Sequence, residues 1–260
     1  MRNIKIGCNW SEALHELLED GLDIDYIKAG EQKNFLDILP NMLKYRNVLL
    51  HGGLGKSIRL GNADGLIDYH QLNQILKVCG TSQYGIHIAF TNDEMSLFDS
   101  GMSFDLEIAR RIRAFAGQIS VPLLLENTPE CYVEKKIYKF YPVSHPDNIA
   151  KIIYSNDVGF LLDITHAKIT AFYNGWNIKE YLSCLPLDRV REIHTNGWGF
   201  KNGRVMDKHS AMEAEDYRLL DWTLERTNPT IVSLEYSGVS GEENFDVKQN
   251  ICKFIKYMAG

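Results

Sequence analysis

The sequence lacks the features that mark secreted, membrane-bound or nucleic-acid-binding proteins. Its net charge is −6, and no run of Lys or Arg forms the basic face that duplex-binding proteins usually carry. No apolar run approaches the ~20 residues of a membrane span, and the N-terminus has no signal-peptide pattern. We therefore expect a cytoplasmic protein that binds neither membranes nor nucleic acid.

Cysteine pairs with metal-binding or redox spacing are also missing. The five cysteines are scattered, odd in number and free of CxxC motifs, which fits a reducing compartment. We expect each of them to be a small buried hydrophobic residue: Cys8, Cys79, Cys131, Cys184 and Cys252. The segment HGGLGKS resembles the end of a P-loop, but Leu50 stands where that motif needs its first glycine.

The chain does contain eight short, β-rich apolar runs with amphipathic segments between them. Near-continuous apolar runs are typical of parallel strands that are covered on both faces. The expected strands are Ile4–Cys8, Ile24–Ala29, Val48–His51, Tyr84–Ala89, Val121–Glu126, Val158–Asp163, Val190–His194 and Thr230–Glu235. The clearest helical segments are Glu12–Leu18, Leu66–Cys79, Phe104–Phe115, Asp147–Tyr154 and Glu215–Arg226. This alternation over 260 residues predicts an α/β fold, a single (β/α)₈ TIM-barrel domain spanning residues 1–260.

Histidine, aspartate and glutamate occupy the ends of six of these strands and the loop after the seventh. In a barrel these ends converge on one face, where active sites are built. The nine candidate metal ligands are His51, His87, Glu126, Asp163, His166, His194, Asp207, His209 and Glu235. The other histidines, His15, His70 and His145, fall on helices or at a helix N-terminus and are not expected in the site.

Four carboxylates at one barrel mouth need compensating cations or strongly raised pKa values. Any single strand-end histidine could instead be a hydrogen-bonded core residue, but five of eight histidines in one mouth favour a metal site. At about three protein ligands per open catalytic metal, nine ligands indicate two or three metal ions. Imidazole and carboxylate together suit iron, zinc or manganese, and the residues alone do not choose among them.

The order of these ligands resembles that of endonuclease IV, one of the xylose-isomerase-like barrels. Other segments resemble the multinuclear non-haem iron-dependent oxidases, whose members include methanobactin-biosynthesis enzymes. These segments are IGCNW, DIDYIKAGE, AFYNGW, EIHTNG and MDKH. Two positions depart from many iron-family members: Lys28-Ala29-Gly30-Glu31 replaces acidic or Asn-rich residues, and His166 stands where Asn is common.

The resemblance to the iron oxidases implies an enzyme that uses O₂ to modify a ribosomally synthesised precursor peptide, at or beside cysteine. It implies two or three irons of mixed Fe²⁺/Fe³⁺ state and catalytic roles for Glu126, Asp163, His194 and Glu235. Glu126 and Glu235 are the expected bridging carboxylates, and His166, Asp207 and His209 the expected third, more exposed site. A small recognition protein is a further possible partner.

Two other enzyme classes remain open from the sequence. One is a trinuclear zinc phosphodiesterase of the endonuclease IV type. The other is a Mn- or Mg-dependent sugar isomerase or epimerase, for which Lys28 or Lys168 could supply the base. A non-catalytic metal-binding protein of a biosynthetic complex is a third hypothesis. Asn127, Asn196 and Tyr236 flank ligands and could orient water, substrate or the ligands themselves.

Overall fold

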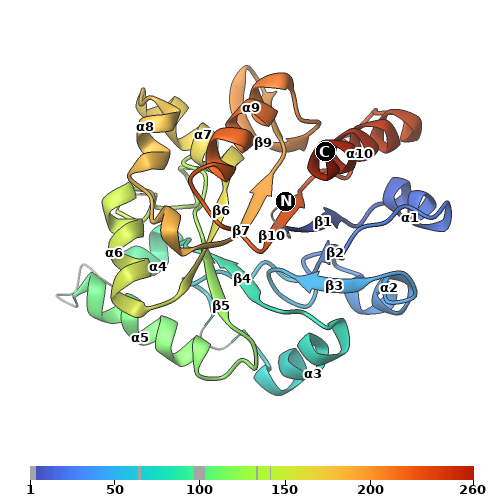
Figure 1. Cartoon of the computed structure of the whole chain (residues 1–260). Coiled ribbons are helices and arrows are strands. Elements are labelled where there is room, and N and C mark those ends of the chain that lie inside the picture. The colour runs from blue at the N-terminus through green and yellow to red at the C-terminus, as the bar shows by residue number, and fades with distance from the viewer. Residues whose placement is uncertain (1–3, 64–65, 97–102, 133, 141) are drawn as a thin grey trace.

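The computed structural model describes residues 4–63, 66–96, 103–132, 134–140 and 142–260. Within them, eight parallel strands form a nearly closed barrel with helices around it (Figure 1), which confirms the predicted TIM barrel. The strands are β1 (Lys5–Asn9), β2 (Tyr26–Ala29), β3 (Asn47–Leu50), β4 (Tyr84–His87), β5 (Leu123–Glu126), β6 (Gly159–Asp163), β7 (Val190–Thr195) and β10 (Ile231–Leu234). Each overlaps a predicted strand, with boundaries that agree to within two residues.

The helices lie outside the strands. The longer ones are α1 (Glu12–Glu19), α2 (Phe35–Met42), α3 (Tyr69–Cys79), α5 (Phe104–Ala116), α6 (Pro146–Asn156), α7 (Ile164–Asn174), α9 (Ala214–Leu224) and α10 (Asn244–Ala259). Shorter ones are α4 (Asn92–Ser96), α8 (Ile178–Ser183) and the 3₁₀ turn η2 (Leu187–Arg189). The helix expected from Leu66 begins instead at Tyr69, because the Asp68 side chain caps it by accepting a hydrogen bond from Gln71 N. None of the helices in the described ranges is long and apolar enough to cross a bilayer.

A two-stranded hairpin is inserted between β7 and α9. It consists of β8 (Gly197–Lys201) and β9 (Arg204–Ser210), which pair antiparallel. Its turn holds Asn202 and Gly203, both with positive φ, as a tight hairpin turn requires. The segment that carries Asp207 and His209 was expected to be a loop; that expectation is wrong, because both residues belong to β9.

The barrel is least continuous between β3 and β4. The sheet order runs from β3 through β2, β1, β10, β7, β6 and β5 to β4. Between the two ends the structure has one bridge, His51 to Gly85, and a hydrogen bond from Gly52 N to Gly85 O (3.2 Å). Further along, Leu60 N donates a hydrogen bond to His87 O (2.9 Å), so the segment after β3 pairs with the carboxyl end of β4.

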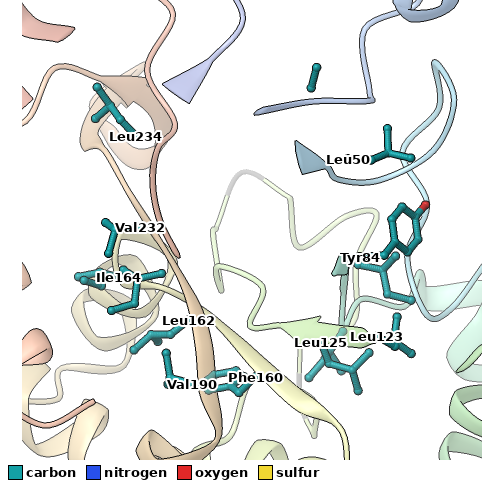
Figure 2. Packing of buried hydrophobic residues seen from close by; sticks show 14 of the residues in the cluster. Leu50, Tyr84, Leu123, Leu125, Phe160, Leu162, Ile164, Val190, Val232 and Leu234 are labelled. Atoms are coloured by element: carbon teal, nitrogen blue, oxygen red, sulfur yellow. The ribbon is translucent and has the colours of Figure 1, made fainter. Parts of the chain in front are cut away.

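Side chains alternate between the two faces of each strand, so that apolar residues face the helices and polar residues at the strand ends face the barrel interior. Figure 2 shows buried apolar side chains such as Leu125 on β5, Leu162 on β6 and Leu234 on β10, which belong to the main core. Their neighbours Glu126 and Asp163 extend from the opposite strand face, into the barrel. A small separate cluster of Tyr26, Leu49 and Ile231 lies in the barrel interior below the polar residues. The period-two pattern thus directs polar strand ends to one mouth.

The cysteine expectation is partly wrong. Cys8, Cys79 and Cys131 are buried as predicted, and all five cysteines are free. Cys184 and Cys252 are exposed. Cys184 immediately follows the short helix α8 and Cys252 lies on the outer helix α10, so neither position faces the core.

Candidate metal centre

The nine predicted ligands gather at the mouth formed by the carboxyl ends of the strands. A cavity of about 340 Å³ opens there. Its walls include His51, His87, His166, Asp207, His209 and Glu235. Glu126, Asp163 and His194 are fully buried and contact these residues from below.

Two groups of donor atoms are close enough to hold a metal ion each. The first comprises His51, His87 and Glu126, and the second Glu126, Asp163, His194 and Glu235. Within each group the donor atoms lie within 4.8 Å of one another. We call them the first and second donor sets. Glu126 belongs to both.

The two carboxylate oxygens of Glu126 face different donor sets. Its Oε2 lies 2.6 Å from His51 Nε2 and 3.3 Å from His87 Nε2. Its Oε1 lies 3.3 Å from His194 Nδ1. A carboxylate placed in this way can bridge two cations, one on each oxygen.

A buried oxygen of Asp163 also indicates a metal ion in the second donor set. Asp163 is the N-cap of α7, and its Oδ1 accepts a hydrogen bond from His166 N (2.7 Å). Its Oδ2 is buried and has no hydrogen-bond partner among the described residues. Such an oxygen is costly in a protein interior, and a metal ion in the second donor set would satisfy it.

The remaining three candidates, His166, Asp207 and His209, are centred on Asp207 and are called the third donor set, although their donor atoms are not all within the 4.8 Å that defines the first two sets. Asp207 Oδ2 lies 3.1 Å from His166 Nε2 and 2.7 Å from His209 Nε2. The side chain of His209 is 46% exposed, whereas that of His166 is only 5% exposed. His209 is the most exposed of the nine candidate side chains.

Burial and mutual charge shift the pKa values of these groups strongly. Burial, together with Glu235 and Glu126, raises the pKa of Asp163 to about 7, against the opposing charge of His166. Burial lowers the pKa of His87 to about 4, so its ring is neutral near pH 7. Burial also acts on His194, but Glu235 and Glu126 outweigh it and raise its pKa to about 10. The shifts of Asp163 and His194 reflect the carboxylates crowded around them, whose negative charge a bound cation would offset.

Polar residues behind the ligands fix their orientation. Glu192 Oε1 lies 2.9 Å from His194 Nε2, on the opposite side of the ring from Glu126 and Glu235, and Glu192 Oε2 accepts a hydrogen bond from Gln83 (2.6 Å). Asn196 Nδ2 donates to Asp207 Oδ1 (2.8 Å). Asn127 is bonded to both backbone groups of Asp163 and so joins the ends of β5 and β6.

Sequence reasoning missed Glu192. The signal was available, since residues two apart on a strand share a face and EIHT places Glu192 on the face of His194. Tyr236, by contrast, was named as a possible orienting residue. Its hydroxyl donates to Glu242 and accepts a hydrogen bond from Asn250, so the hydroxyl contacts that the structure describes lie away from the ligands.

Lys28 brings a positive charge into the centre. It lies at 5% exposure on β2, and its ammonium group forms an ion pair with Glu235. Burial alone would lower the pKa of Lys28, but Glu235 and Glu126 outweigh burial and raise it, so the group stays charged. Lys168, the other candidate base, is not among the residues that line the cavity. Its Nζ lies 2.8 Å from Asp216 Oδ1.

The other three histidines lie where the sequence placed them. His15 and His70 are within α1 and α3, and His145 is the residue before α6. None of them lines the cavity.

Solved structures with the same architecture are numerous. A xylose isomerase domain protein from Alicyclobacillus acidocaldarius matches with a TM-score of 0.61 and 16% identity over 98% of both chains. An AP endonuclease of family 2 from Brucella melitensis matches with a TM-score of 0.63 and 12% identity over 99% of both chains. At these identities the likeness establishes the fold alone.

Sequence relatives are more informative. A UPF0276 protein of Bordetella pertussis is 29% identical over 167 residues, which cover 58% of this chain and 55% of the relative. A UPF0276 protein of Acaryochloris marina is 24% identical over 201 residues, covering 73% and 69%. The chain thus spans only about half the length of the first of these relatives.

Residues 25–240 match a protein family described as RiPP precursor modification enzyme MbnB/TglH/ChrH. RiPPs are ribosomally synthesised and post-translationally modified peptides. The matched range contains all nine candidate ligands and the strands β2 to β10 that present them. It leaves out only β1, α1, α10 and the residues around them. The chain therefore belongs to the RiPP precursor modification enzyme family MbnB/TglH/ChrH.

Proposed function

We propose that this protein is an iron-dependent oxidase that modifies a ribosomally made precursor peptide at or beside a cysteine, with O₂ as electron acceptor. Two or three iron ions of mixed Fe²⁺/Fe³⁺ state would occupy the donor sets. The observation that carries the proposal is the placement of Glu126, whose two oxygens face separate donor sets. Family membership supports a peptide substrate.

Charge supports more than one metal ion. Glu126, Asp163, Glu235 and Asp207 contribute four carboxylates, and Lys28 contributes the one buried ammonium beside them. Three negative charges then remain, so a single divalent cation leaves the centre anionic. Buried charge of one sign is unstable without compensation. A second divalent cation brings the sum from −1 to +1, and a third would need an added anion such as hydroxide or a substrate thiolate.

Each donor set has its own place in the proposal. The first and second sets are joined by Glu126 and lie deepest, with Asp163 and His194 fully excluded from solvent. We assign catalytic roles to the four residues that make up the second set, which are Glu126, Asp163, His194 and Glu235. The third set, with the half-exposed His209, lies nearest to the solvent. Iron bound by such mixed imidazole and carboxylate ligands supplies redox chemistry with O₂ and a Lewis acid for a thiolate.

The chain's own residues would prepare the substrate. A cysteine thiol that enters the cavity meets a neutral His87 ring and the charged Lys28 ammonium. The positive charge of the Lys28 ammonium favours the thiolate over the thiol. The His87 ring, with its pKa of about 4, is too weak a base to keep the thiol proton, so that proton leaves to solvent. The buried floor made by Asp163 and His194 keeps bulk water from the reacting end of the peptide.

Metal analysis of protein purified without oxygen tests the proposal. We expect two to three equivalents of iron per chain and O₂ uptake that depends on a cysteine-containing peptide encoded beside the gene. Tightly bound zinc, no iron and no O₂ uptake would contradict the oxidase. That outcome would instead support a zinc phosphodiesterase.

The variant Glu126→Ala tests the bridging role. We expect it to lose metal from both the first and second donor sets while the barrel stays folded by circular dichroism. Asp216→Ala is the matched control, because Asp216 is a buried carboxylate that pairs with Lys168 outside the cavity. It should lose stability and keep its metal. Full metal content in Glu126→Ala would remove Glu126 from the centre.

A further inference from the structure

A cationic groove lies beside the metal cavity, in a chain whose net charge is −6. Its volume is about 650 Å³. It is lined by Tyr132, Lys135, Lys136, Lys201, Asn202 and Arg204, with no acidic residue among them. Four positive charges thus gather on one small surface of an acidic protein.

The groove is built from two segments that pack together. One segment follows β5 and contains residues 131–132 and 134–138, and the other is the β8–β9 hairpin. The buried residues Cys131, Ile169 and Val205 form a small apolar cluster between them. Above it the Arg204 guanidinium lies 4.0 Å from the centre of the Tyr132 ring. These contacts hold the two walls of the groove in a fixed relation.

The positive charge in the groove is largely uncompensated. Lys135 Nζ lies 3.4 Å from Glu130 Oε1, and the Lys135 side chain remains 49% exposed. For Lys136 and Lys201, no carboxylate among the described residues lies within ion-pair distance of the ammonium group. Uncompensated clustered cations attract an anionic ligand and speed its association.

The residues that line the groove are sequence neighbours of residues in the metal cavity. Glu134, which lines the cavity, directly precedes Lys135 and Lys136 in the chain. Arg204 lies on β9, three residues before Asp207 of the third donor set. A strand rises about 3.3 Å per residue, so the groove begins about 10 Å from that set. An extended peptide of about three or four residues covers this distance.

We infer that the groove binds an acidic segment of the peptide whose modified residue lies in the metal cavity. That the ligand is a peptide depends on the proposed function, whereas its acidic character is inferred from the positive charge of the groove. A cluster of Asp or Glu about three to eight residues from the modified position fits this arrangement. The contact would increase the affinity for the peptide and leave the reacting residue free to enter the cavity.

Binding of a fluorescein-labelled peptide of eight glutamates to the metal-free protein tests the inference. We expect anisotropy to show binding at about 50 mM salt that weakens as salt rises, as exposed charges require. The double variant Lys135→Glu/Lys136→Glu should weaken binding at least tenfold. An octaglutamine peptide should not bind.

The matched control is Lys44→Glu/Lys77→Glu. Both lysines are exposed and lie at or just after the ends of the outer helices α2 and α3, on the side of the barrel away from the metal cavity. This control changes the net charge by the same amount and should bind the probe like the natural protein. Equal loss in both double variants would overturn the inference, because it would reflect net charge alone.

A second ligand separates peptide from nucleic acid. A single-stranded oligonucleotide that binds more tightly than octaglutamate, through Lys135 and Lys136, would also overturn the inference. Because all of these measurements use metal-free protein, they do not depend on iron or O₂. Failure of the oxidase proposal and failure of the groove are therefore distinguishable.

Discussion

Glu192 holds the His194 ring on the side that faces away from the cavity. The distance from its Oε1 to His194 Nε2 is 2.9 Å, which leaves His194 Nδ1 directed at Glu126 and Glu235. A carboxylate in this position fixes the ring and increases its basicity.

We predict that Glu192→Gln weakens metal binding by about 10- to 100-fold, as changes at such orienting residues usually do. Competition with a coloured chelator measures the affinity. Glu130→Gln is the control, since Glu130 accepts hydrogen bonds from Ser144 and Asn174 outside the donor sets. An unchanged affinity in Glu192→Gln would show that the orientation of His194 does not depend on this carboxylate.

Lys28 compensates Glu235 when no metal is present. Breaking a buried ion pair by removing one partner costs about 3–5 kcal/mol. We predict that metal-free Lys28→Met is destabilised by about that amount. Added metal should restore more stability to the variant than to the natural protein, because a cation can replace the ammonium. Thermal unfolding with and without metal provides the measurement, and an equal increase in both proteins would contradict this role.

The ligands could be predicted from the sequence because each ends a strand or follows one closely, and strand ends converge in a barrel. The Lys28–Glu235 pair could not. Lys28 is on β2 and Glu235 follows β10, and β1 lies between these strands in the sheet. Only the curvature of the closed sheet brings their side chains together, and curvature has no local sequence signal.

At the scale of elements, the position of β4 depends on a glycine. A side-chain carbon added at Gly85 would lie 2.9 Å from His51 Cδ2 and 2.6 Å from Leu161 Cδ1. The absence of a side chain at Gly85 therefore leaves room for the His51 ring beside Glu126.

We predict that Gly85→Ala displaces His51 and lowers metal occupancy of the first donor set, with an overpacking cost of about 1–3 kcal/mol. Gly159→Ala is the matched control. Its added carbon would meet Leu124 Cδ2 at 2.4 Å, near the start of β6 and away from the ligands. Metal analysis of both variants should show loss only in Gly85→Ala; equal loss would indicate a general effect of overpacking.

The β8–β9 hairpin and helix α7 were the elements hardest to foresee. The hairpin sequence GWGFKNGRVMDKHS mixes glycine, charge and aromatic residues, which hides the alternation of a strand. Helix α7 begins directly at the end of β6 and is buried on nearly all sides in its first two turns, so it lacks an amphipathic pattern. Both elements are specified by tertiary contacts rather than by local periodicity.

For the whole molecule, metal binding and proton binding compete. The raised pKa values of Asp163, about 7, and of His194, about 10, mean that metal-free protein at pH 6 carries protons on both groups. A metal ion needs the carboxylate and the neutral ring, so binding must release these protons.

We therefore predict that metal affinity rises with pH between about 6 and 9. Calorimetric titrations in buffers of different ionisation enthalpy should show at least one proton released per chain at pH 7. Fewer protons should be released at pH 9, where Asp163 is already ionised. A pH-independent affinity with no proton release would show that neither group binds the metal.

The discontinuity between β3 and β4 gives the first donor set a mechanical role as well. His51 and His87 stand on opposite sides of that discontinuity, and few backbone hydrogen bonds cross it. A cation held by both rings would cross-link the two ends of the sheet. Metal binding would then close the barrel between β3 and β4. Amide hydrogen exchange at Gly52 and Leu60 should slow on metal addition if this is so, and rates that do not change would show that the sheet is already closed without metal.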